Sequence, residues 1–471
     1  MTEATRSAEI RSRLSHPVLD ADGHYVEYMP LMLEIMREVG GQRLVDHYGV
    51  RHPRWYALSD AQRQARRYTR PPWWALPSAN TLDSATSVLP RLLRARMDEI
   101  GLDYAVLYPS NGLGAAHLSD EELRRGSCRS WNTYIAEVFG PHADRMTPAA
   151  VIPMHTPAEA VEELEFAAGK GLKTIVMASH VIRPIQDRRQ GAYLDVFALD
   201  SDYDYDPVWA KCVELRLAPT FHSGGMGWGS RMSPSTYMYN HVGHFAAASE
   251  AICKALFFGG VTRRFPTLRF GFLEGGVGWG VDLFAGLVGR FDKRGGGRVA
   301  NYDPERFDKA MWGELFEQYA EGRMASLTAP DQLEDPWRRL GPGLQDPNRL
   351  DDFAAAGIVQ PEDIAARFVP NFYFGCEADD PVNAWAFAAK ANPFGQTIRA
   401  VFSSDIGHWD VPDMREVLEE AYELVEHELL TDADFRDFVF VNTARLYAGT
   451  NPEFFKGTTV EAAIAGLQLD G

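Results

Sequence analysis

The sequence predicts an α/β protein built as a distorted (β/α)8 TIM barrel, with helical insertions and a C-terminal helix. Three observations lead to this prediction. Eight short apolar segments have the character of strands, predicted helices separate them, and polar side chains suited to chemistry follow several strands directly. Short strands that are apolar throughout are typical of parallel sheets buried on both faces. In such barrels the functional groups lie at the carboxyl ends of the strands.

The first predicted strand covers 18–24 and contains Asp20, Asp22 and His24. Side chains two apart on a strand point to the same face, so these three could converge on one cation. An acidic turn leaving a strand is the alternative interpretation of this stretch taken alone.

A predicted helix at 28–50 leads into residues 51–80, which are rich in Trp, Pro and Arg and have little periodicity. Long irregular segments in compact proteins commonly serve as covers for functional sites. We therefore expect 51–80 to cover the barrel mouth, either its own or that of a neighbouring subunit. Arg67, Arg70 and Trp74 are its candidate substrate contacts, the arginines through a substrate carboxylate.

From residue 89 onward, predicted helices and strands alternate. The strands are expected at 104–108, 149–153, 172–177, 218–221, 268–273, 372–374 and 400–403. The helices are expected at 89–100, 131–139, 157–170, 207–216, 245–258, 281–291 and 432–448. Thr156 is the expected N-cap of the helix that begins at Pro157.

Domain organisation follows from this pattern rather than from length. Residues 295–369 interrupt the alternation with charged, Pro-containing helical sequence, and we expect them to be an insertion between strands six and seven. The remaining alternation is continuous, so we expect a single domain over residues 1–471.

Composition excludes several classes of function. A formal net charge of -18 argues against nucleic acid or an anionic membrane as partner, since both favour clustered Lys and Arg. No apolar run reaches the roughly 18 residues of a membrane span, and residues 1–15 lack the apolar core of a secretory signal. We therefore expect a cytoplasmic protein. The four cysteines are widely spaced, which indicates neither disulfides nor a thiolate zinc site.

Four side chains at strand ends form a candidate metal site: Asp22, His24, His222 and Asp405. They offer two imidazoles and two carboxylates from strands one, five and eight, which suits one divalent cation, Zn²⁺ first and Mn²⁺ second. Taken singly, each histidine could be a hydrogen-bonded structural residue and Asp405 could cap a helix. Their joint placement favours the metal site.

Several motifs give the chain a family resemblance. They are Asp20-x-Asp22-x-His24, residues 145–153 followed by a Pro-x-Glu-Ala helix, Phe265-Pro266-x-Leu268-Arg269, Phe272 to Trp279, and Ser404-Asp405-x-x-His408-Trp409-Asp410. With these motifs the chain resembles the amidohydrolase superfamily, in the branch of aminocarboxymuconate semialdehyde decarboxylase and the gamma-resorcylate type decarboxylases. The resemblance implies that Asp22, His24, His222 and Asp405 bind the metal. Ser179 and His180 stand where binuclear members carry a Lys, which implies one metal ion.

The chain departs from this pattern at strand six, where Glu274 replaces a histidine that many decarboxylases of the branch use for proton transfer. Glu274 could itself act as acid or base, or could orient the metal shell. His180 and His241 are further candidates for proton transfer, with His244 close to His241. His408 is expected to pack against Trp409.

The resemblance implies an enzyme that uses one divalent metal ion to cleave a C–C bond of a carboxylated aromatic or ring-derived small molecule. The simplest such reaction is non-oxidative decarboxylation, with Asp405, Glu274 or a nearby histidine moving a proton. One alternative is a metal-dependent hydrolase of an amide, ester, lactone or vinylogous ketone. A binding protein on an inactive barrel is the other. We expect a homodimer or higher homo-oligomer, with neither nucleic acid nor membrane as partner.

Overall fold

The computed structural model describes residues 4–56, 58–71, 76–77, 79–185, 191–330, 332–333 and 350–469. Its main sheet has eight strands, each parallel to its neighbours, in the order β1-β2-β3-β4-β7-β8-β9-β10. Their bounds are β1 Leu19–Tyr25, β2 Tyr104–Pro109, β3 Met146–Ile152, β4 Thr174–Met177, β7 Pro219–Phe221, β8 Phe270–Phe272, β9 Phe372–Glu377 and β10 Arg399–Ser403. All eight coincide with predicted strands.

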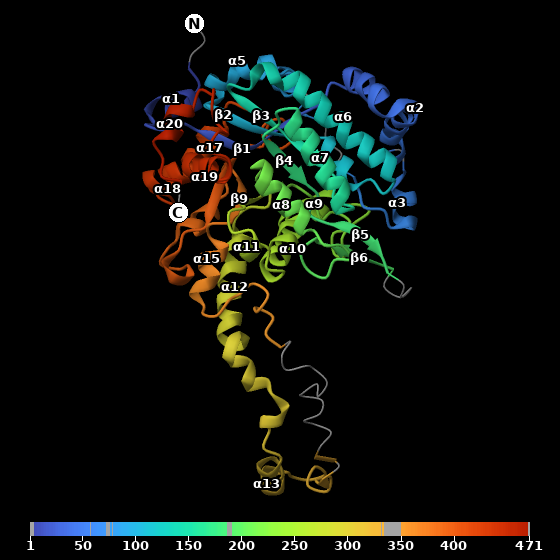
Figure 1. Ribbon diagram of the computed structural model, residues 1–471, viewed down its shortest axis with the longest axis vertical. Coiled ribbons are helices and arrows are strands. Elements are labelled where there is room, and N and C mark those ends of the chain that lie inside the picture. The colour runs from blue at the N-terminus through green and yellow to red at the C-terminus, as the bar shows by residue number, and fades with distance from the viewer. Residues whose placement is uncertain are drawn as a thin grey trace.

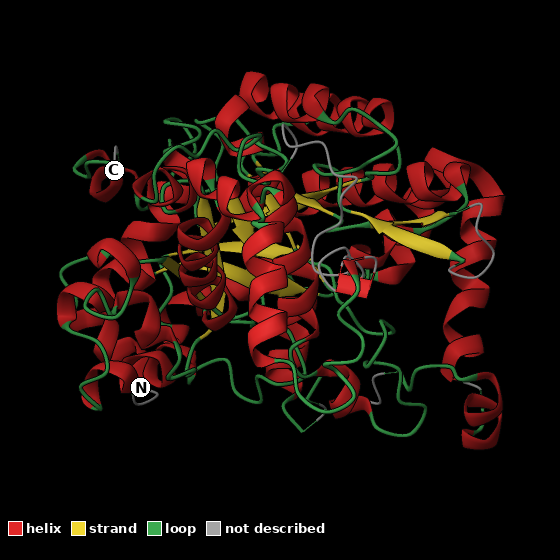
Figure 2. Ribbon diagram, turned by 90° about the horizontal axis from the view of Figure 1, so that it is seen from below, coloured by secondary structure: helices red, strands yellow, loops and turns green. Residues whose placement is uncertain are grey.

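Backbone hydrogen bonds join the first and last strands. The Asp405 N–H donates to the Asp22 carbonyl oxygen over 3.0 Å, and the His24 N–H donates to the Ile406 carbonyl oxygen over 2.6 Å. Figure 2 shows the strands enclosed by helices. The prediction of a (β/α)8 TIM barrel is therefore confirmed.

Eight helices of the described chain lie between the strands or after the last one. They are α5 Pro90–Ile100, α6 Glu121–Phe139, α7 Pro157–Gly169, α8 Asp206–Leu215, α10 His244–Phe258, α12 Gly278–Arg294, α15 Glu362–Phe368 and α17 Val417–Glu426. Helix α7 begins as predicted, because Thr156 and Glu159 form a reciprocal capping box. Helix α6 begins ten residues before the predicted start. Its first half is mostly polar, so the apolar periodicity marks only its second half.

The described chain also contains short helices. They are α1 Arg6–Arg13, α3 Asp60–Arg66, α4 Thr81–Val88, α9 Tyr237–His241, α11 Val261–Arg264, α16 Asn383–Phe387 and α20 Glu461–Ala465. The C-terminal helix predicted at 432–448 is present as α18 Asp432–Arg436, a π-helical turn and α19 Asn442–Ala448. No helix within the described ranges has the length and apolarity to cross a membrane.

The core lies inside the barrel and between the barrel and its helices. Every residue of β1, β2, β3 and β4 is buried, which explains why these strands are mostly apolar; the polar residues of β1 are those of the site and its seam. All four cysteines are buried free thiols, in agreement with the sequence.

The segment after β1 is more regular than predicted. Helix α2 Met29–Tyr56 continues beyond residue 50, with a kink at Gly41, whose φ is 70°. Helix α3 follows and begins with a capping box between Ser59 and Gln62. The expectation of an irregular chain from residue 51 was therefore wrong for 51–56 and 60–66. At 60–66 the Ser59 cap and good helix formers give a helix without an apolar stripe.

A two-stranded antiparallel hairpin follows β4 and was not predicted. It pairs β5 Val181–Pro184 with β6 Ala192–Asp195. An ion pair of 2.9 Å joins Arg183 to Asp195 across the hairpin. Strands of four residues with charged side chains give too short a pattern to be recognised from sequence.

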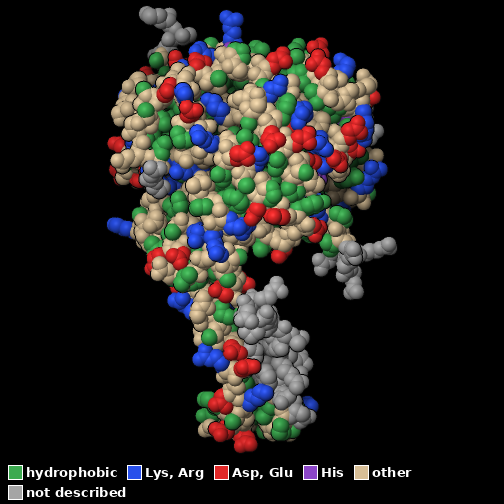
Figure 3. Space-filling view, viewed as in Figure 1, with side chains coloured by type: hydrophobic (Ala, Val, Ile, Leu, Met, Phe, Trp, Pro, Cys, Tyr) green, Lys and Arg blue, Asp and Glu red, His purple; other side chains and the backbone are tan. Residues whose placement is uncertain are grey.

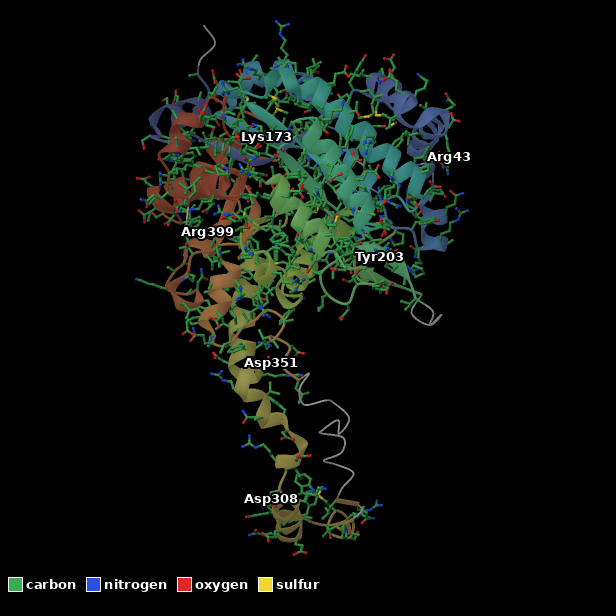
Figure 4. The ribbon with its side chains drawn as sticks, in the orientation of Figure 1. Arg43, Lys173, Tyr203, Asp308, Asp351 and Arg399 are labelled. Carbon is green, nitrogen blue, oxygen red and sulfur yellow. The ribbon has the colours of Figure 1, made fainter. Side chains whose placement is uncertain are left out.

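Between β8 and β9, a long arm projects from the barrel (Figure 1). Helix α12 carries the chain outward, and η3 Gly296–Tyr302, η4 Pro304–Arg306 and α13 Lys309–Tyr319 follow. Asp308, labelled near the far end of the arm in Figure 4, caps α13 by accepting from the Met311 N–H over 2.9 Å. In Figure 3 apolar and charged side chains mix over this tip.

Candidate metal centre

The first strand presents two of its three polar side chains to the site. Its pairing with β2 is irregular between Asp20 and Gly23, so Asp20 leaves the alternation that would align it with Asp22. The Asp20 carboxylate instead accepts from the Ser404 N–H over 3.0 Å and from the Ser404 hydroxyl over 2.6 Å. Asp20 therefore holds β1 to the end of β10, while Asp22 and His24 remain for the site.

The four predicted metal ligands lie close together at the carboxyl ends of their strands. His24 Nε2 is 3.2 Å from Asp405 Oδ1 and 3.6 Å from Asp22 Oδ1. His222 Nε2 is 3.6 Å from Asp22 Oδ2, and the two imidazole rings meet edge to face at 5.0 Å. The barrel thus brings together residues up to 383 positions apart in the sequence, from Asp22 to Asp405.

Two further side chains join this cluster. Glu274 Oε2 is 3.0 Å from His222 Nε2 and 3.8 Å from His24 Nε2. His408 stacks on His24 with ring centroids 3.7 Å apart, and its Nδ1 is 2.7 Å from Asp405 Oδ1. The structure therefore places His408 in the cluster, although the sequence indicated only packing against Trp409. Its spacing of three from Asp405 was the available signal.

Around His24, the ligand atoms form two overlapping groups. Asp22, His24 and His222 make one, and His24, Glu274, Asp405 and His408 make the other, each with its ligand atoms within 4.8 Å of one another. His24 belongs to both. Because the two groups meet at His24, one ion bound beside its Nε2 could take ligands from either group.

These groups suit a divalent cation because their polar atoms have no hydrogen-bond partner. Asp22 Oδ1, His24 Nε2, His222 Nε2, Glu274 Oε2 and both Asp405 carboxylate oxygens are buried and unpaired in this way. Buried polar atoms in proteins are almost always satisfied. Convergent unpaired imidazole and carboxylate atoms are the ligands that Zn²⁺ and Mn²⁺ prefer.

The electrostatics of the cluster agree with this. Burial raises the pKa of Asp22, Asp405 and Glu274 well above the usual range, because an ionised carboxylate loses hydration there. The charge of Glu274 adds to the shift at Asp22 and Asp405. Burial lowers the pKa of His24 and His222. Both imidazoles are thus neutral and able to bind a cation, while the carboxylates need a positive charge beside them to ionise.

The backbone at two of these positions is strained. Glu274 has a φ of 55° and Asp405 a φ of 50°, in the left-handed region that side chains other than Gly seldom adopt. Strain of this kind persists where the surrounding structure imposes it and is concentrated at functional sites. It turns both carboxylates into the site directly after their strands end.

The two histidines proposed for proton transfer lie outside the ligand groups. His180 is 5% exposed, and its ring lies 5.2 Å from that of His117 and 4.8 Å from that of Trp228. His241, on α9, lies 4.8 Å from the ring of His244 and 5.7 Å from that of Trp409.

His244 is a buried histidine that sequence reasoning did not select. It is 5% exposed, neither ring nitrogen has a hydrogen-bond partner, and a Cβ on Gly224 would come within 2.4 Å of its Nδ1. The His244 ring therefore packs against the loop just after His222.

The predicted substrate contacts of the 51–80 segment are not among the clustered ligand residues. Arg67 ends α3 and is exposed. Arg70 anchors the segment to the loop after β7, because its N–H donates to the Ser233 carbonyl over 2.9 Å and its guanidinium to the Ser235 carbonyl over 3.1 Å. Trp74 lies outside the described residues.

Comparison with known proteins places the chain in a family. A family model described as Amidohydrolase matches residues 89–324, which is half of the 471 residues. No curated protein matches the chain in sequence.

Solved structures share its fold at low sequence identity. An amidohydrolase from Mycobacterium avium subsp. paratuberculosis is 17% identical with a TM-score of 0.53, over 92% of this chain and 100% of that one. A dihydroxybenzoic acid decarboxylase from a Polaromonas species, with bound manganese and the inhibitor 2-nitroresorcinol, is 14% identical with a TM-score of 0.50, over 94% and 99%. A 5-carboxyvanillate decarboxylase from Sphingomonas paucimobilis is 14% identical with a TM-score of 0.51, over 92% and 99%. The family match and the barrel agree, and the chain belongs to the amidohydrolase family.

Proposed function

We propose that this protein is a metal-dependent enzyme that cleaves a C–C bond of a carboxylated aromatic or ring-derived small molecule, most simply by non-oxidative decarboxylation. The observation that carries the proposal is the convergence of buried, unpaired ligand atoms from Asp22, His24, His222 and Asp405 at the carboxyl end of the barrel. Two solved structures of the same fold are decarboxylases of aromatic acids, which supports this reaction class.

In this proposal the four residues hold one divalent ion. The ion would bind substrate oxygens and stabilise the negative charge that develops as the carboxylate leaves. In a non-oxidative decarboxylation the C–C bond breaks, its electron pair stays on the ring carbon, and a proton takes the place of carbon dioxide. The chain must therefore supply an acid beside the ion.

Glu274 is our first candidate for that acid, because its Oε2 lies 3.0 Å from His222 Nε2 and faces the ligand groups. Asp405, His180 and His241 are the other candidates. Arg67, Arg70 and Trp74 remain proposed substrate contacts at the mouth, the arginines for a carboxylate.

Hydrolysis of an amide, ester, lactone or vinylogous ketone is the second candidate, and Glu274 is the observation that favours it. A carboxylate in place of the histidine that the resemblance leads one to expect suits a base that activates water. Asp405 would share this role. The same metal ligands serve both reactions.

The identity of the ion and of the assembly belong to the proposal as well. Imidazole and carboxylate ligands suit Zn²⁺ and Mn²⁺, and the manganese in one structure of the same fold supports Mn²⁺. We propose a homodimer or higher homo-oligomer, supported by the exposed Met311, Leu315 and Tyr319 on the projecting arm. Light scattering measures the mass of the assembly.

The experiment combines metal analysis with a substrate screen. Protein purified without added metal should contain a divalent ion, and loaded protein should release carbon dioxide from one of a set of carboxylated phenols and ring-cleavage products. His222→Ala should abolish turnover and lower the affinity for metal by roughly tenfold or more, because it removes one ligand. Full activity in metal-free protein would contradict the proposed site.

A further inference from the structure

A chain of buried hydroxyl groups runs next to the candidate metal centre. The Tyr108 hydroxyl, near the end of β2, lies 3.1 Å from Thr220 Oγ1 on β7 and 3.1 Å from the Tyr447 hydroxyl on α19. The Thr220 hydroxyl in turn donates to the carbonyl oxygen of Ile175, on β4, over 2.6 Å. Tyr108, Thr220 and Tyr447 are each no more than 1% exposed. The chain thus joins three strands of the barrel to the C-terminal helix.

The number of donors fixes the direction of each hydrogen bond in this chain. A tyrosine or threonine hydroxyl has one proton to donate, and a backbone carbonyl can only accept. Thr220 gives its proton to the Ile175 carbonyl, so its oxygen must accept from Tyr108. The Tyr108 proton is then used, and Tyr447 must donate to the Tyr108 oxygen. Tyr108 is therefore held from both sides, and removal of its hydroxyl leaves two buried partners unsatisfied.

The ring of Tyr108 contacts both histidines that we propose as metal ligands. His24 is its neighbour in the register of β1 with β2, and the two ring centroids are 6.4 Å apart. The His222 ring lies 5.7 Å from that of Tyr108. Thr220, which anchors the Tyr108 hydroxyl, precedes His222 by two residues, which places both side chains on the same face. The hydroxyl is therefore anchored toward the amino end of the barrel, below the imidazoles.

The two imidazoles lack the hydrogen bond that usually orients a metal-binding histidine. Such a histidine commonly donates from its second ring nitrogen to a carbonyl or a carboxylate. Nδ1 of His24 and Nδ1 of His222 are both buried without a hydrogen-bond partner. Burial lowers the pKa of His24 and the Tyr108 carbonyl opposes that shift, yet this carbonyl does not reach hydrogen-bond geometry with the ring. Packing against neighbouring rings therefore orients both imidazoles.

From these contacts we infer that Tyr108 is a positioning residue of the metal centre, whose ring sets the separation of His24 and His222. The hydrogen bonds with Tyr447 and Thr220 fix that ring in place. The C-terminal helix α19 thereby takes part in holding the metal site, although Tyr447 follows Tyr108 by 339 residues. This inference rests on the metal site of the proposed function, but not on the reaction assigned to it.

Metal affinity tests the inference without any substrate. The full-length protein is stripped with a chelator and titrated with Mn²⁺ in a calorimeter, and the visible absorption of bound Co²⁺ reports the geometry of the ligands. Tyr108→Phe keeps the ring but removes its anchor, so affinity for Mn²⁺ should fall by about tenfold or more and the Co²⁺ spectrum should change. Thr220→Val and Tyr447→Phe each remove one partner of the hydroxyl and should also weaken binding.

Tyr104→Phe is the matched control, because Tyr104 lies on the same strand, is 1% exposed and has a buried hydroxyl without a hydrogen-bond partner. It should keep the affinity and the Co²⁺ spectrum of wild type. Circular dichroism checks that each variant folds. Tyr447→Phe leaves the Tyr108 side chain intact and carries the test if Tyr108→Phe does not fold.

Wild-type affinity and an unchanged Co²⁺ spectrum in Tyr108→Phe and Tyr447→Phe overturn the inference even if Tm falls, because the hydroxyl chain then contributes stability alone. An equal loss of affinity in Tyr104→Phe overturns it as well. A wild type that binds no divalent ion contradicts the metal site of the proposed function and this inference with it. Weaker binding in the variants of a protein that releases no carbon dioxide supports the inference and contradicts only the proposed reaction.

Discussion

Glu274 contacts both of the histidines that we propose as metal ligands. Its carboxylate oxygen lies 3.0 Å from His222 Nε2 and 3.8 Å from His24 Nε2, and its backbone has a φ of 55°. This position allows two roles, proton transfer to the substrate or orientation of the metal ligands. The two roles differ in what they require: a titratable group in the first case, and a hydrogen-bonding one in the second.

Glu274→Gln separates these roles, because Gln keeps size and hydrogen bonding but cannot titrate. If Glu274 transfers the proton, turnover should fall by about a hundredfold or more while metal content barely changes. If it orients the metal ligands, metal affinity should fall by roughly tenfold or more, and added metal should restore much of the rate. A variant with normal turnover and normal affinity would exclude both roles and transfer the acid role to His180 or His241.

At the scale of elements, the Asp20–Ser404 pair adds side-chain contacts to the backbone hydrogen bonds that join β1 to the end of β10. Asp20 accepts two hydrogen bonds from Ser404, and burial raises its pKa to about 6 although those bonds oppose the shift. This seam also carries Asp22 and Asp405 into the site. The irregular pairing of β1 at Asp20 therefore gives the two aspartates different roles. Asp20 bonds Ser404, and Asp22 remains a candidate metal ligand.

Ser404→Ala should destabilise the metal-free protein by about 1–3 kcal/mol, because it leaves a buried carboxylate short of a donor. The measurement is the free energy of unfolding from denaturant titration. Ser403→Ala is the matched control, since the Ser403 hydroxyl is buried without a hydrogen-bond partner. Equal losses in both variants would show that the Asp20 contact contributes no more than packing.

The segment after α3 and the loop after β7 form a second pair of elements at the mouth. Arg70 joins them through the Ser233 and Ser235 carbonyls. Arg70 can hold these two elements together and also bind a substrate carboxylate, because a guanidinium has five donors and the loop occupies few of them.

Arg70→Ala should raise the KM for a carboxylated substrate about tenfold or more, through loss of a charge-assisted hydrogen bond. Steady-state kinetics on the substrate found by the carbon dioxide screen measures it. Arg67→Ala is the companion variant, since Arg67 is exposed at the end of α3. If neither change moves KM, the substrate carboxylate is bound elsewhere.

For the whole molecule, the buried carboxyls couple metal binding to pH. Without an ion, burial raises the pKa of Asp22 and Asp405, so folding takes up protons that the unfolded chain has lost above about pH 4. Their contribution to stability is present at low pH and is lost as pH rises through the folded pKa. A bound cation reverses this, because it favours the ionised carboxylates.

The stabilisation by metal should therefore increase with pH. We expect the difference in Tm between metal-loaded and metal-free protein to increase from pH 5.5 to 8 at fixed free Mn²⁺, because binding releases protons. Differential scanning calorimetry at several pH values measures it. His222→Ala should flatten the dependence by weakening binding. A pH-independent difference in wild type would mean that the carboxyls are already ionised without the ion.

The sequence by itself determined the barrel and its metal-type residues. Short, mostly apolar segments separated by predicted helices are a local signal that needs no knowledge of long-range contacts. Asp22, His24, His222 and Asp405 stand out because they lie at the carboxyl ends of such segments. Hydrophobic periodicity did not predict the polar first half of α6 or the short β5–β6 hairpin, because both have few apolar residues in a regular pattern.

Only the tertiary structure decided which polar side chains converge. A period of two placed Asp20 with Asp22, but the irregular pairing of β1 turned Asp20 to Ser404. His408 joined the cluster because the chain that leaves β10 turns at Asp405, whose backbone is left-handed, and this brings the His408 ring to the Asp405 carboxylate. Register and backbone strain are set by contacts between residues far apart in the sequence, and no local pattern records them.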